Sequence, residues 1–544
     1  MKSDTVSASE QPEQPRRSDG LARHASVTGA ATLASRILGL ARDQVLAAFF
    51  GAGNEMDAFV VAFRIPNLVR DLFAEGAMSA AFVPTFTKQL TLNGKDQAWR
   101  LGNNVLNALL VATGTLVVLG MVFARPLIEL YAGDFASVPG KLELTVQLTR
   151  IMFPFLVMVA VAAVLMGMLN SLHHYFVPAL APAMFNIATI AGAFILVPVM
   201  RSLGLPAIVA IALAALAGGL GQVAIQWPAL RREGFRYRLL FEPRDPVLRR
   251  MLLLMGPGTI GLAATQVNLF VNTLLATSQG TGAPSWLTYA FRLMYLPIGL
   301  FGVSIGTAVL PAVSRHAALG NTAGMRDTVS RGLGMMLMMN VPATFGLFVL
   351  ATPIVQLLFE RGHFLPADTA ATAAALRFYA VGLAGYSAAR IASPTFYAIG
   401  ESRVPAMVSG GVILVNAIAS LLLVRAIGFV GLALGTSIAA MANAAVLVWL
   451  LRRRLGGLDG RRLSTTFIKV TAAAFVMALV AVAIQHEMEW LAPGLHGGWR
   501  AVRLAASIGG ALVALAAAAK LLRVDEFDDA VGMMRGRVRK LLEK

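Results

Sequence analysis

Long apolar stretches alternate with short polar interruptions along nearly the whole of this chain. Most stretches are close to the ~20 residues that a helix needs to cross a bilayer. The interruptions are rich in glycine, proline and charged residues, which are typical of loops between spans. The pattern predicts an all-α polytopic membrane protein with 14 transmembrane helices. The expected spans lie at residues 27–50, 56–87, 101–123, 144–170, 177–199, 205–227, 250–277, 285–311, 332–352, 368–397, 404–424, 429–451, 465–485 and 500–522.

Composition supports this interpretation, because only 14% of the 544 residues are charged and 57% are hydrophobic. A soluble domain usually carries about 25% charged residues. The formal net charge of +18 would suggest nucleic acid as a partner of a soluble protein. In a membrane protein it is better explained by arginines and lysines that gather in cytoplasmic loops, so we expect no nucleic acid partner. The chain has no cysteine, which excludes disulfides and thiol chemistry.

Loop charge predicts the orientation of the spans. The loops at 228–250 and 452–462 and the tail after residue 534 are rich in arginine, whereas the loop at 278–284 carries no charge. We therefore expect a multi-pass protein of the bacterial inner membrane with both termini in the cytoplasm. Residues 1–26 are polar and predict a disordered cytoplasmic tail.

An internal repeat divides the chain. Proline and arginine residues recur at a spacing of 227 in four places, at Pro84 and Pro311, Pro126 and Pro353, Arg150 and Arg377, and Pro178 and Pro405. Six spans per copy give both copies the same orientation, which predicts two parallel six-helix lobes. The expected parts are the tail 1–26, an N-lobe at 27–230, a basic linker at 231–250, a C-lobe at 251–455, spans 13 and 14 at 456–525, and a cytoplasmic tail at 526–544.

Charged residues inside the spans are the strongest functional signal, because each costs roughly 2.5–3.5 kcal/mol at mid-bilayer. Arg36 and Asp43 are seven residues apart on one helix face. A second stripe comprises Asp57, Arg64, Asn67, Asp71 and Glu75. An internal ion pair of Arg64 is an alternative to a functional role. Arg42, Arg70 and Arg292 are expected to lack neutralising partners in their own helices, which leaves them available for a ligand.

Arginines that converge between the lobes would form a cationic cavity suited to phosphate, since the guanidinium group donates two parallel hydrogen bonds. The expected cargo is an anion with a lipid tail. No Walker A sequence, HExxH motif or histidine cluster with metal-ligand spacing occurs. We therefore expect a transporter that is not an enzyme and has no cofactor, driven by an ion gradient or the membrane potential. A membrane-embedded polyprenyl-phosphate enzyme and a cation exporter are the alternatives.

At this point the chain resembles the MurJ/MviN family, the lipid II flippases of the multidrug/oligosaccharidyl-lipid/polysaccharide exporter superfamily. The resemblance covers about residues 27–525. It is carried by SRILGLARD at 35–43, GAG at 51–53, DAF at 57–59, PNLVR at 66–70, FAEGA at 73–77, AFVP at 81–84, YAFRLM at 289–294 and LP at 296–297.

The resemblance implies two lobes around a central cationic cavity, and a groove for the polyprenyl tail on spans 13 and 14. The implied partner is lipid II, the undecaprenyl-pyrophosphate-linked disaccharide-peptide, which crosses from the cytoplasmic to the periplasmic leaflet by alternating access during cell-wall synthesis. A flippase for another polyprenyl-pyrophosphate glycan is the alternative. The implied residues are Arg36, Arg42, Arg70 and Arg292 for the pyrophosphate, and Asp57, Glu75, Arg64, Asn67 and Arg390 in supporting or gating roles.

Three positions depart from the family pattern. The family usually has a second basic residue where Asp71 stands here, and acids at the positions of Phe291 and Tyr295. The last two changes leave Arg292 less neutralised, and Asp71 partly offsets Arg70. The departures leave the pairing of the gate residues open, as the sequence also does for the coupling ion and the oligomeric state.

Overall fold

Helices are the regular elements throughout the residues that the structure describes, which are 17–70, 78–491, 497–529 and 531–532. The structure is a computed structural model. The N-terminal half comprises α1 (Arg17–Phe50), α2 (Asn54–Arg70), α3 (Met78–Val122), α4 (Ala124–Ala132), the 3-10 helix η2 (Gly133–Ser137), α5 (Lys141–Met152), α6 (Phe155–Ser171), α7 (Phe176–Ser202) and α8 (Val209–Arg232).

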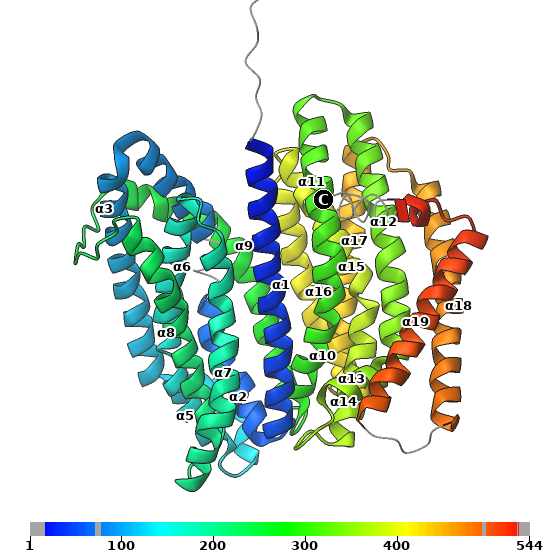
Figure 1. Ribbon diagram of the computed structural model, residues 1–544, viewed down its shortest axis with the longest axis horizontal. Coiled ribbons are helices and arrows are strands. Elements are labelled where there is room, and N and C mark those ends of the chain that lie inside the picture. Colours follow the sequence, from blue (N-terminus) through cyan, green and yellow to red (C-terminus); the bar gives the residue numbers. More distant parts are fainter. Residues whose placement is uncertain (1–16, 71–77, 492–496, 530, 533–544) are drawn as a thin grey trace, which may run out of the picture.

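The C-terminal half repeats this organisation, and two further helices follow it. It comprises α9 (Pro246–Thr277), α10 (Ala283–Pro297), the π-helical segment η3 (Ile298–Gly302), α11 (Val303–Ala318), α12 (Thr322–Val349), α13 (Ala351–Phe359), α14 (Pro366–Val381), α15 (Leu383–Ala398), α16 (Arg403–Ile427) and α17 (Val430–Arg454). The last two helices are α18 (Gly460–Leu491) and α19 (Gly498–Leu521). Below, the upper end is the end at which α1 begins in Figure 1, and the lower end is the opposite one.

The first helix starts earlier than the polar composition of its sequence suggests. Residues 17–26 belong to α1, although we expected them in a disordered tail, and residues 1–16 lie outside the described part. The segment contains Leu21, Ala22, Arg23 and Ala25, which have high helix propensity and extend a helix that the following apolar span already nucleates.

Ten helices in the described part are long and apolar enough to cross a membrane, so this is a multi-pass membrane protein. The predicted count of fourteen stays a prediction. Four expected spans are not among these ten helices of the described part, namely 27–50, 56–87, 250–277 and 368–397, and residues 71–77 of the second lie outside that part. The first carries Arg36, Arg42 and Asp43, and the last is divided between α14 and α15. Two of the charges of the first span, Arg42 and Asp43, belong to the candidate site described below.

The repeat predicted from the sequence recurs in the helix boundaries and in a hydrogen bond. The helix α13 begins and ends 227 residues after α4. Arg150 donates from Nε to the carbonyl of Met121 at 3.2 Å, and Arg377 donates to the carbonyl of Phe348 at 3.3 Å. The two residues that supply the carbonyl groups, Met121 and Phe348, are also 227 residues apart. Arg377 therefore neutralises the C-terminal end of a helix.

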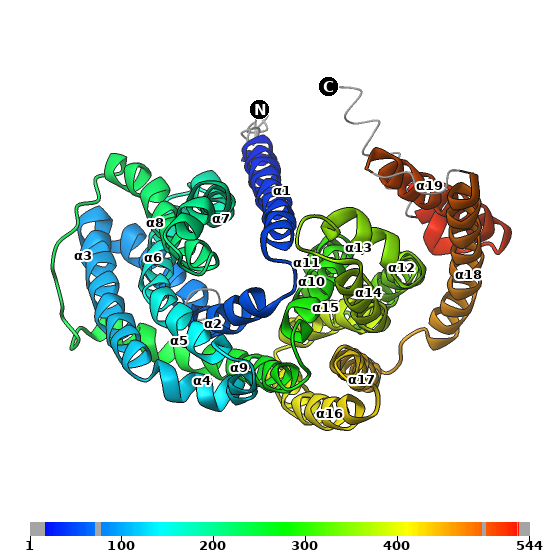
Figure 2. The same cartoon turned by 90° about the horizontal axis from the view of Figure 1, so that it is seen from below.

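The two halves lie side by side, and α18 and α19 stand at the outer edge of the C-terminal half (Figures 1 and 2). The helix α18 packs against α12, with Val470, Ala473 and Met477 in a shared apolar core. A second core contains Leu46 and Phe50 of α1 together with Leu287 and Tyr289 of α10. This core joins the two halves near the lower end, where α1 stops.

The segment between the halves is held against the N-terminal half. The predicted basic linker at 231–250 corresponds to a loop between Arg232 and Pro246. Asn103 donates to the carbonyl of Arg236, and Asn104 both accepts from the backbone N–H of Glu242 and donates to its carbonyl. These amide groups satisfy the backbone of an extended segment that has no strand beside it. The loop is therefore positioned by α3.

Small residues let the helices of the C-terminal half approach closely, which supports a prediction. A β-carbon on Gly385 of α15 would lie 2.7 Å from the backbone carbonyl of Ala440 in α17, and backbone atoms cannot rotate away. We expect Gly385→Ala to lower the free energy of unfolding by about 1–3 kcal/mol. The measurement is the thermal midpoint in detergent.

The matched control for this prediction is Gly410→Ala in α16, where nothing lies within 4 Å of the added β-carbon. Alanine there should be neutral or should stabilise the helix by up to about 1 kcal/mol. Equal thermal midpoints for the two variants would contradict the proposed close packing of α15 on α17.

Candidate functional site

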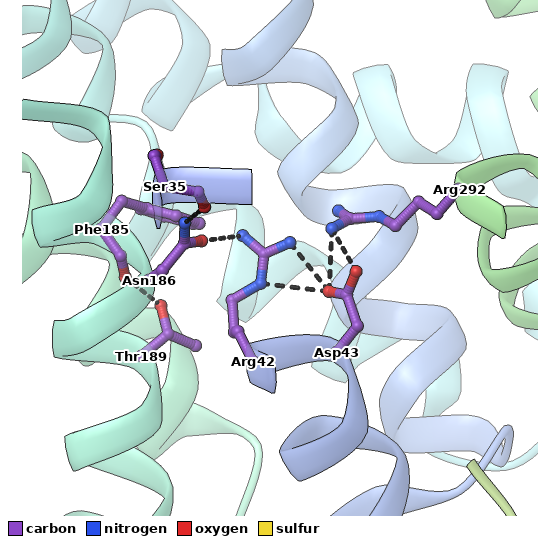
Figure 3. Close-up of polar contacts among 7 residues, drawn as sticks. All are labelled: Ser35, Arg42, Asp43, Phe185, Asn186, Thr189 and Arg292. Atoms are coloured by element: carbon purple, nitrogen blue, oxygen red, sulfur yellow. Dashed lines mark hydrogen bonds and ion pairs between the residues drawn. The ribbon is translucent and has the colours of Figure 1, made fainter. Parts of the chain in front are cut away.

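Two arginines from different halves of the molecule meet on one carboxylate (Figure 3). Arg42 and Asp43 lie on α1, and Arg292 lies on α10. Arg42 donates to Asp43 Oδ1 from Nε at 3.1 Å and from Nη2 at 2.8 Å. Arg292 Nη1 donates to the same Oδ1 at 2.8 Å and also bonds Oδ2. The single carboxylate of Asp43 thus binds two guanidinium groups, and the cluster keeps a net charge of +1.

Further contacts orient the Arg42 guanidinium group. Its Nη1 donates to Asn186 Oδ1 on α7 at 3.0 Å, and Asn186 in turn donates to the carbonyl of Ser35. The ring of Phe185 lies 5.2 Å from the guanidinium carbon, which adds a cation–π contact. Arg42 is only 8% exposed, whereas the side chain of Arg292 is 42% exposed. Arg42 is therefore preorganised, and Arg292 is the more accessible cation.

These residues line a cavity of about 90 Å³ between the two halves. Its charged lining residues are Arg42, Asp43, Arg64 and Arg292, which gives a formal charge of +2. Arg64 Nε is buried without a hydrogen-bond partner among the described residues. A buried unpaired donor is costly, and a ligand oxygen in the cavity would satisfy it. The lining thus offers several cationic donors to an anion.

A second cavity of about 320 Å³ shares lining residues with the first and is lined mainly by the N-terminal half. Arg42, Asn67 and Arg292 line both cavities. The second is otherwise apolar apart from amide side chains such as Gln222 and Gln226. Asn67 Oδ1 and Gln226 Oε1 are buried without a partner in the part of the chain that the structure describes. Neutral acceptors and donors of this kind suit the hydroxyl and amide groups of a bulky polar ligand.

Below the cavity, Asp57 connects the two halves. It is fully buried and forms an ion pair with Lys141 of α5 at 2.9 Å. From the other half it accepts hydrogen bonds from the backbone N–H of Gly282 at 2.7 Å and from the hydroxyl of Ser285 at 2.6 Å. The helix α10 has no cap from its own N-cap side chain, so Asp57 supplies the cap from the opposite half.

Two glycines lie at further contacts between the two halves near the lower end. Gly51, between α1 and α2, and Gly362, after α13, both have a left-handed backbone that favours glycine. A β-carbon on either would clash with the backbone of the opposite half, at His363 or Ala48 respectively. The N–H of His363 donates to the carbonyl of Ala48 at 2.9 Å. Together with Asp57, these contacts close the lower end of the space between the halves.

Other residues expected at the site lie at its margin. Arg36 is exposed and is not among the cavity-lining residues. Its guanidinium group lies against Gly299 in η3, in the space that a β-carbon would occupy. Arg390 donates from Nη2 to the hydroxyl of Tyr295 at 2.6 Å. A tyrosine at this position therefore still binds an arginine, although it adds no negative charge.

Three residues that the sequence singled out lie in part or wholly outside the described structure. The backbone of Arg70 ends α2, but its side chain is outside the described residues, and so are Glu75 and Asp71 in their entirety. Their predicted roles stay predictions.

The structure corrects two expectations about charge pairing. Arg42 was expected to find no partner in its own helix, but it bonds Asp43, its immediate neighbour. The long arginine side chain folds back over an adjacent short carboxylate, which a projection of Cα positions at ~100° per residue does not represent. An ion pair of Arg64 with an acid of its own helix was the alternative to a functional role, but Asp57 pairs with Lys141 on another helix.

Sequence reasoning did not single out Asp43, Asn186, Lys141 or Ser285 as site residues. Asp43 had a usable signal, because it is an acid in a predicted span beside an arginine. Lys141 and Asn186 had none, since each acquires its partner only through packing of distant helices.

Comparison with known proteins identifies close similarity to one family. The family model described as "Lipid II flippase MurJ" matches residues 46–495. A probable lipid II flippase MurJ of Rhizobium meliloti (strain 1021) is 36% identical over 484 residues, which cover 87% of this chain and 88% of the relative. The lipid II flippase MurJ of Burkholderia cenocepacia is 34% identical over 451 residues, with 82% and 87% coverage.

Solved structures agree with these matches. A lipid II flippase MurJ in an inward closed conformation superposes with a TM-score of 0.74 at 26% identity, over 91% of this chain and 99% of that chain. A multidrug resistance MATE family transporter in an inward-facing conformation has a TM-score of 0.65 at 18% identity and covers 79% of this chain and 98% of that one. The latter likeness concerns the fold alone.

Proposed function

Because this chain belongs to the MurJ family of lipid II flippases, we propose a transport mechanism built on the shared carboxylate of Asp43. The protein is a lipid II flippase, which moves the lipid-linked precursor of peptidoglycan across the membrane. Its relatives are named as flippases, and we propose that this chain likewise translocates lipid II without breaking a bond.

The observation that carries the mechanism is that Arg42 and Arg292 share Asp43 across the cavity. The pyrophosphate of lipid II presents several anionic oxygens and can compete with one carboxylate for both guanidinium groups. Arg42 belongs to the N-terminal half and Arg292 to the C-terminal half, so a bound pyrophosphate would bridge the halves. Arg64 offers a further donor. Binding is thereby coupled to the relative position of the two halves.

Access to the cavity alternates between the two ends of the molecule in this proposal. The contacts of Asp57, Gly51 and Gly362 close the lower end. For the headgroup to leave there, these contacts must break. The same contacts then re-form after release.

We assign the upper end to the cytoplasm of a bacterium and the protein to its inner membrane. The arginine-rich loops before α9 and α18 both lie at the upper end, as does the start of α1. The positive-inside rule favours this orientation. Both chain termini are then cytoplasmic. The polyprenyl tail remains in the membrane during transport and follows the surface of α18 and α19.

Translocation by the purified protein in liposomes tests this function. Fluorescent lipid II should lose its signal to a membrane-impermeant quencher faster in proteoliposomes than in protein-free liposomes, without added ATP. An imposed membrane potential should change the rate if the potential drives transport. No transport above the protein-free level, with or without a potential, would contradict the proposal. Recovery of a chemically altered lipid would favour the enzyme alternative.

A further inference from the structure

The second cavity, of about 320 Å³, differs in its chemistry from the site of the two arginines beside it. Helices α6, α7 and α8 of the N-terminal half form most of its wall. Among the described residues that line it, the charged ones are Arg42 and Arg292, and both of these also line the first cavity. Positive charge is therefore confined to the junction of the two cavities. The remainder of the second cavity is neutral and suits an uncharged part of a ligand.

Two glutamines of α8 supply neutral hydrogen-bonding groups to this cavity. Gln222 and Gln226 are four residues apart and lie on one face of the helix. Gln226 is 1% exposed, and its Nε2 donates to the carbonyl of Ala162 at 3.2 Å and to that of Gln222 at 2.9 Å. Both partners are acceptors, so the amide nitrogen must face them, which fixes the orientation of the side chain. Its carbonyl oxygen Oε1 is left without a partner among the described residues.

The unpaired oxygens favour hydrogen-bond donors on the ligand. Asn67 of α2 also lines the cavity, and its Oδ1 is likewise a buried acceptor without a partner in the described structure. A buried acceptor of this kind is unfavourable in the empty protein, whereas a hydroxyl or amide N–H group of a ligand would satisfy it. A carboxylate has only acceptors, so the same oxygens disfavour it. The polar groups therefore select a neutral ligand group that carries donors.

Three aromatic rings form an apolar part of the same wall. Phe63, Phe155 and Phe185 line the cavity, and their ring centroids lie between 5.4 and 5.5 Å from one another. The face of an aromatic ring is electron-rich and attracts polarised C–H groups. A sugar ring presents C–H groups on its faces and hydroxyl groups at its rim. The combination of aromatic rings with amide side chains is therefore suited to a sugar.

The wall is held in place because α8 packs closely on its neighbours. A β-carbon on Gly218 of α8 would lie 2.7 Å from Cα of Phe185 in α7, and one on Gly219 would lie 3.0 Å from the ring of Phe155 in α6. These glycines bring the backbone of α8 against both helices that carry these rings. The two glutamines follow about one and two turns later on α8. The amides are thus positioned relative to the aromatic rings before a ligand binds.

We propose that the second cavity binds the sugar attached directly to the pyrophosphate of lipid II, and that Gln222 and Gln226 determine specificity for it. This inference rests on the proposed function, because it takes Arg42 and Arg292 as the pyrophosphate site. The adjoining cavity must then receive the group that is bonded to the phosphate, which is the disaccharide. Gln226 Oε1 accepts a hydrogen bond from a hydroxyl or N-acetyl N–H group of the sugar. The peptide, which carries carboxylates, stays outside this cavity.

Binding of two ligands to the purified full-length protein tests the proposal. Lipid II carries the sugars, whereas undecaprenyl pyrophosphate has the same pyrophosphate and tail without them. We expect Gln226→Leu to bind lipid II about tenfold more weakly, because a hydrogen bond to the ligand is lost, and to bind undecaprenyl pyrophosphate with unchanged affinity. Gln222→Leu should show the same selective loss. Gln97→Leu, at an exposed glutamine of α3 outside the cavity, is the matched control and should bind both ligands as the unsubstituted protein does.

Thermal midpoints separate loss of binding from loss of folding. The midpoint of Gln226→Leu without ligand should stay equal or rise, since the substitution removes a buried acceptor that has no partner among the described residues. An equal loss of affinity for both ligands in this variant would show a general structural role and would overturn the proposal. Unchanged affinity for lipid II in both glutamine variants would overturn it as well.

A third ligand distinguishes the sugars from the peptide. With lipid II from which the peptide has been removed, the loss of affinity in Gln222→Leu and Gln226→Leu should persist. Disappearance of that loss would show that the cavity holds the peptide, which contradicts the assignment to a sugar. Failure of the proposed function has a different signature, because Arg292→Ala would then leave the affinity for undecaprenyl pyrophosphate unchanged.

Discussion

Replacement of Arg42 by alanine is expected to abolish growth of cells that depend on this protein for lipid II transport. Arg42 is buried and donates to Asp43 and Asn186, so its removal deletes the preorganised cation of the cavity. Loss of one partner of a buried charged pair costs about 2–5 kcal/mol, which corresponds to roughly 30-fold to several-thousand-fold weaker binding of the pyrophosphate. Arg292→Ala should have a comparable effect, because Arg292 is the accessible cation from the opposite half.

The measurement is complementation of a flippase-depleted strain, together with the amount of variant protein in the membrane. Arg331→Ala is the matched control, since Arg331 is an exposed arginine that pairs with Asp327 outside the cavity. Normal growth with Arg42→Ala or Arg292→Ala at unchanged protein levels would disprove the cationic cavity as the pyrophosphate site. Arg292→Lys adds a finer test, because lysine keeps the charge but loses the planar pair of donors.

Asp57→Asn is expected to open the lower end of the molecule and to stop transport. The substitution leaves Lys141 buried with only a neutral partner, and it weakens the cap of α10 that Gly282 and Ser285 complete. The contacts that cross between the halves are the hydrogen bonds from Gly282 and Ser285 to the Asp57 carboxylate, and a hydrogen bond to a charged group contributes about 1.5–3 kcal/mol. The closed state loses this stabilisation, and the equilibrium shifts towards states in which the two halves are separated at this end.

Cysteine labelling measures this shift without background, because the chain has no cysteine of its own. A single cysteine at Thr288, which lines the cavity above the closure, should react faster with an impermeant thiol reagent from the lower side in Asp57→Asn than in its parent. Lys141→Met combined with Asp57→Asn removes both charges and should recover thermal stability without restoring closure. Equal labelling rates in parent and variant would show that Asp57 has no part in closing this end.

Residue pattern alone was enough for the class of protein and for its division into repeats. Apolar stretches of the length of a bilayer leave helices as the expected spanning element, because each backbone polar group is satisfied within its own helix. The 227-residue spacing of Arg150 and Arg377 recurs in the structure as a repeated hydrogen bond. Such features depend on neighbours in the chain and are therefore visible in the sequence.

The sequence by itself also identified the charged side chains that are unfavourable inside a membrane span. Three of them, Arg42, Arg64 and Arg292, line the cavity. Only the tertiary structure decided their partners. Asp43 binds Arg292, which lies 249 residues away in the sequence, and Asp57 finds Lys141 rather than a residue of its own helix. A helical projection orders the side chains of one helix but contains no information about which other helix packs against it. That choice depends on how all the helices pack together.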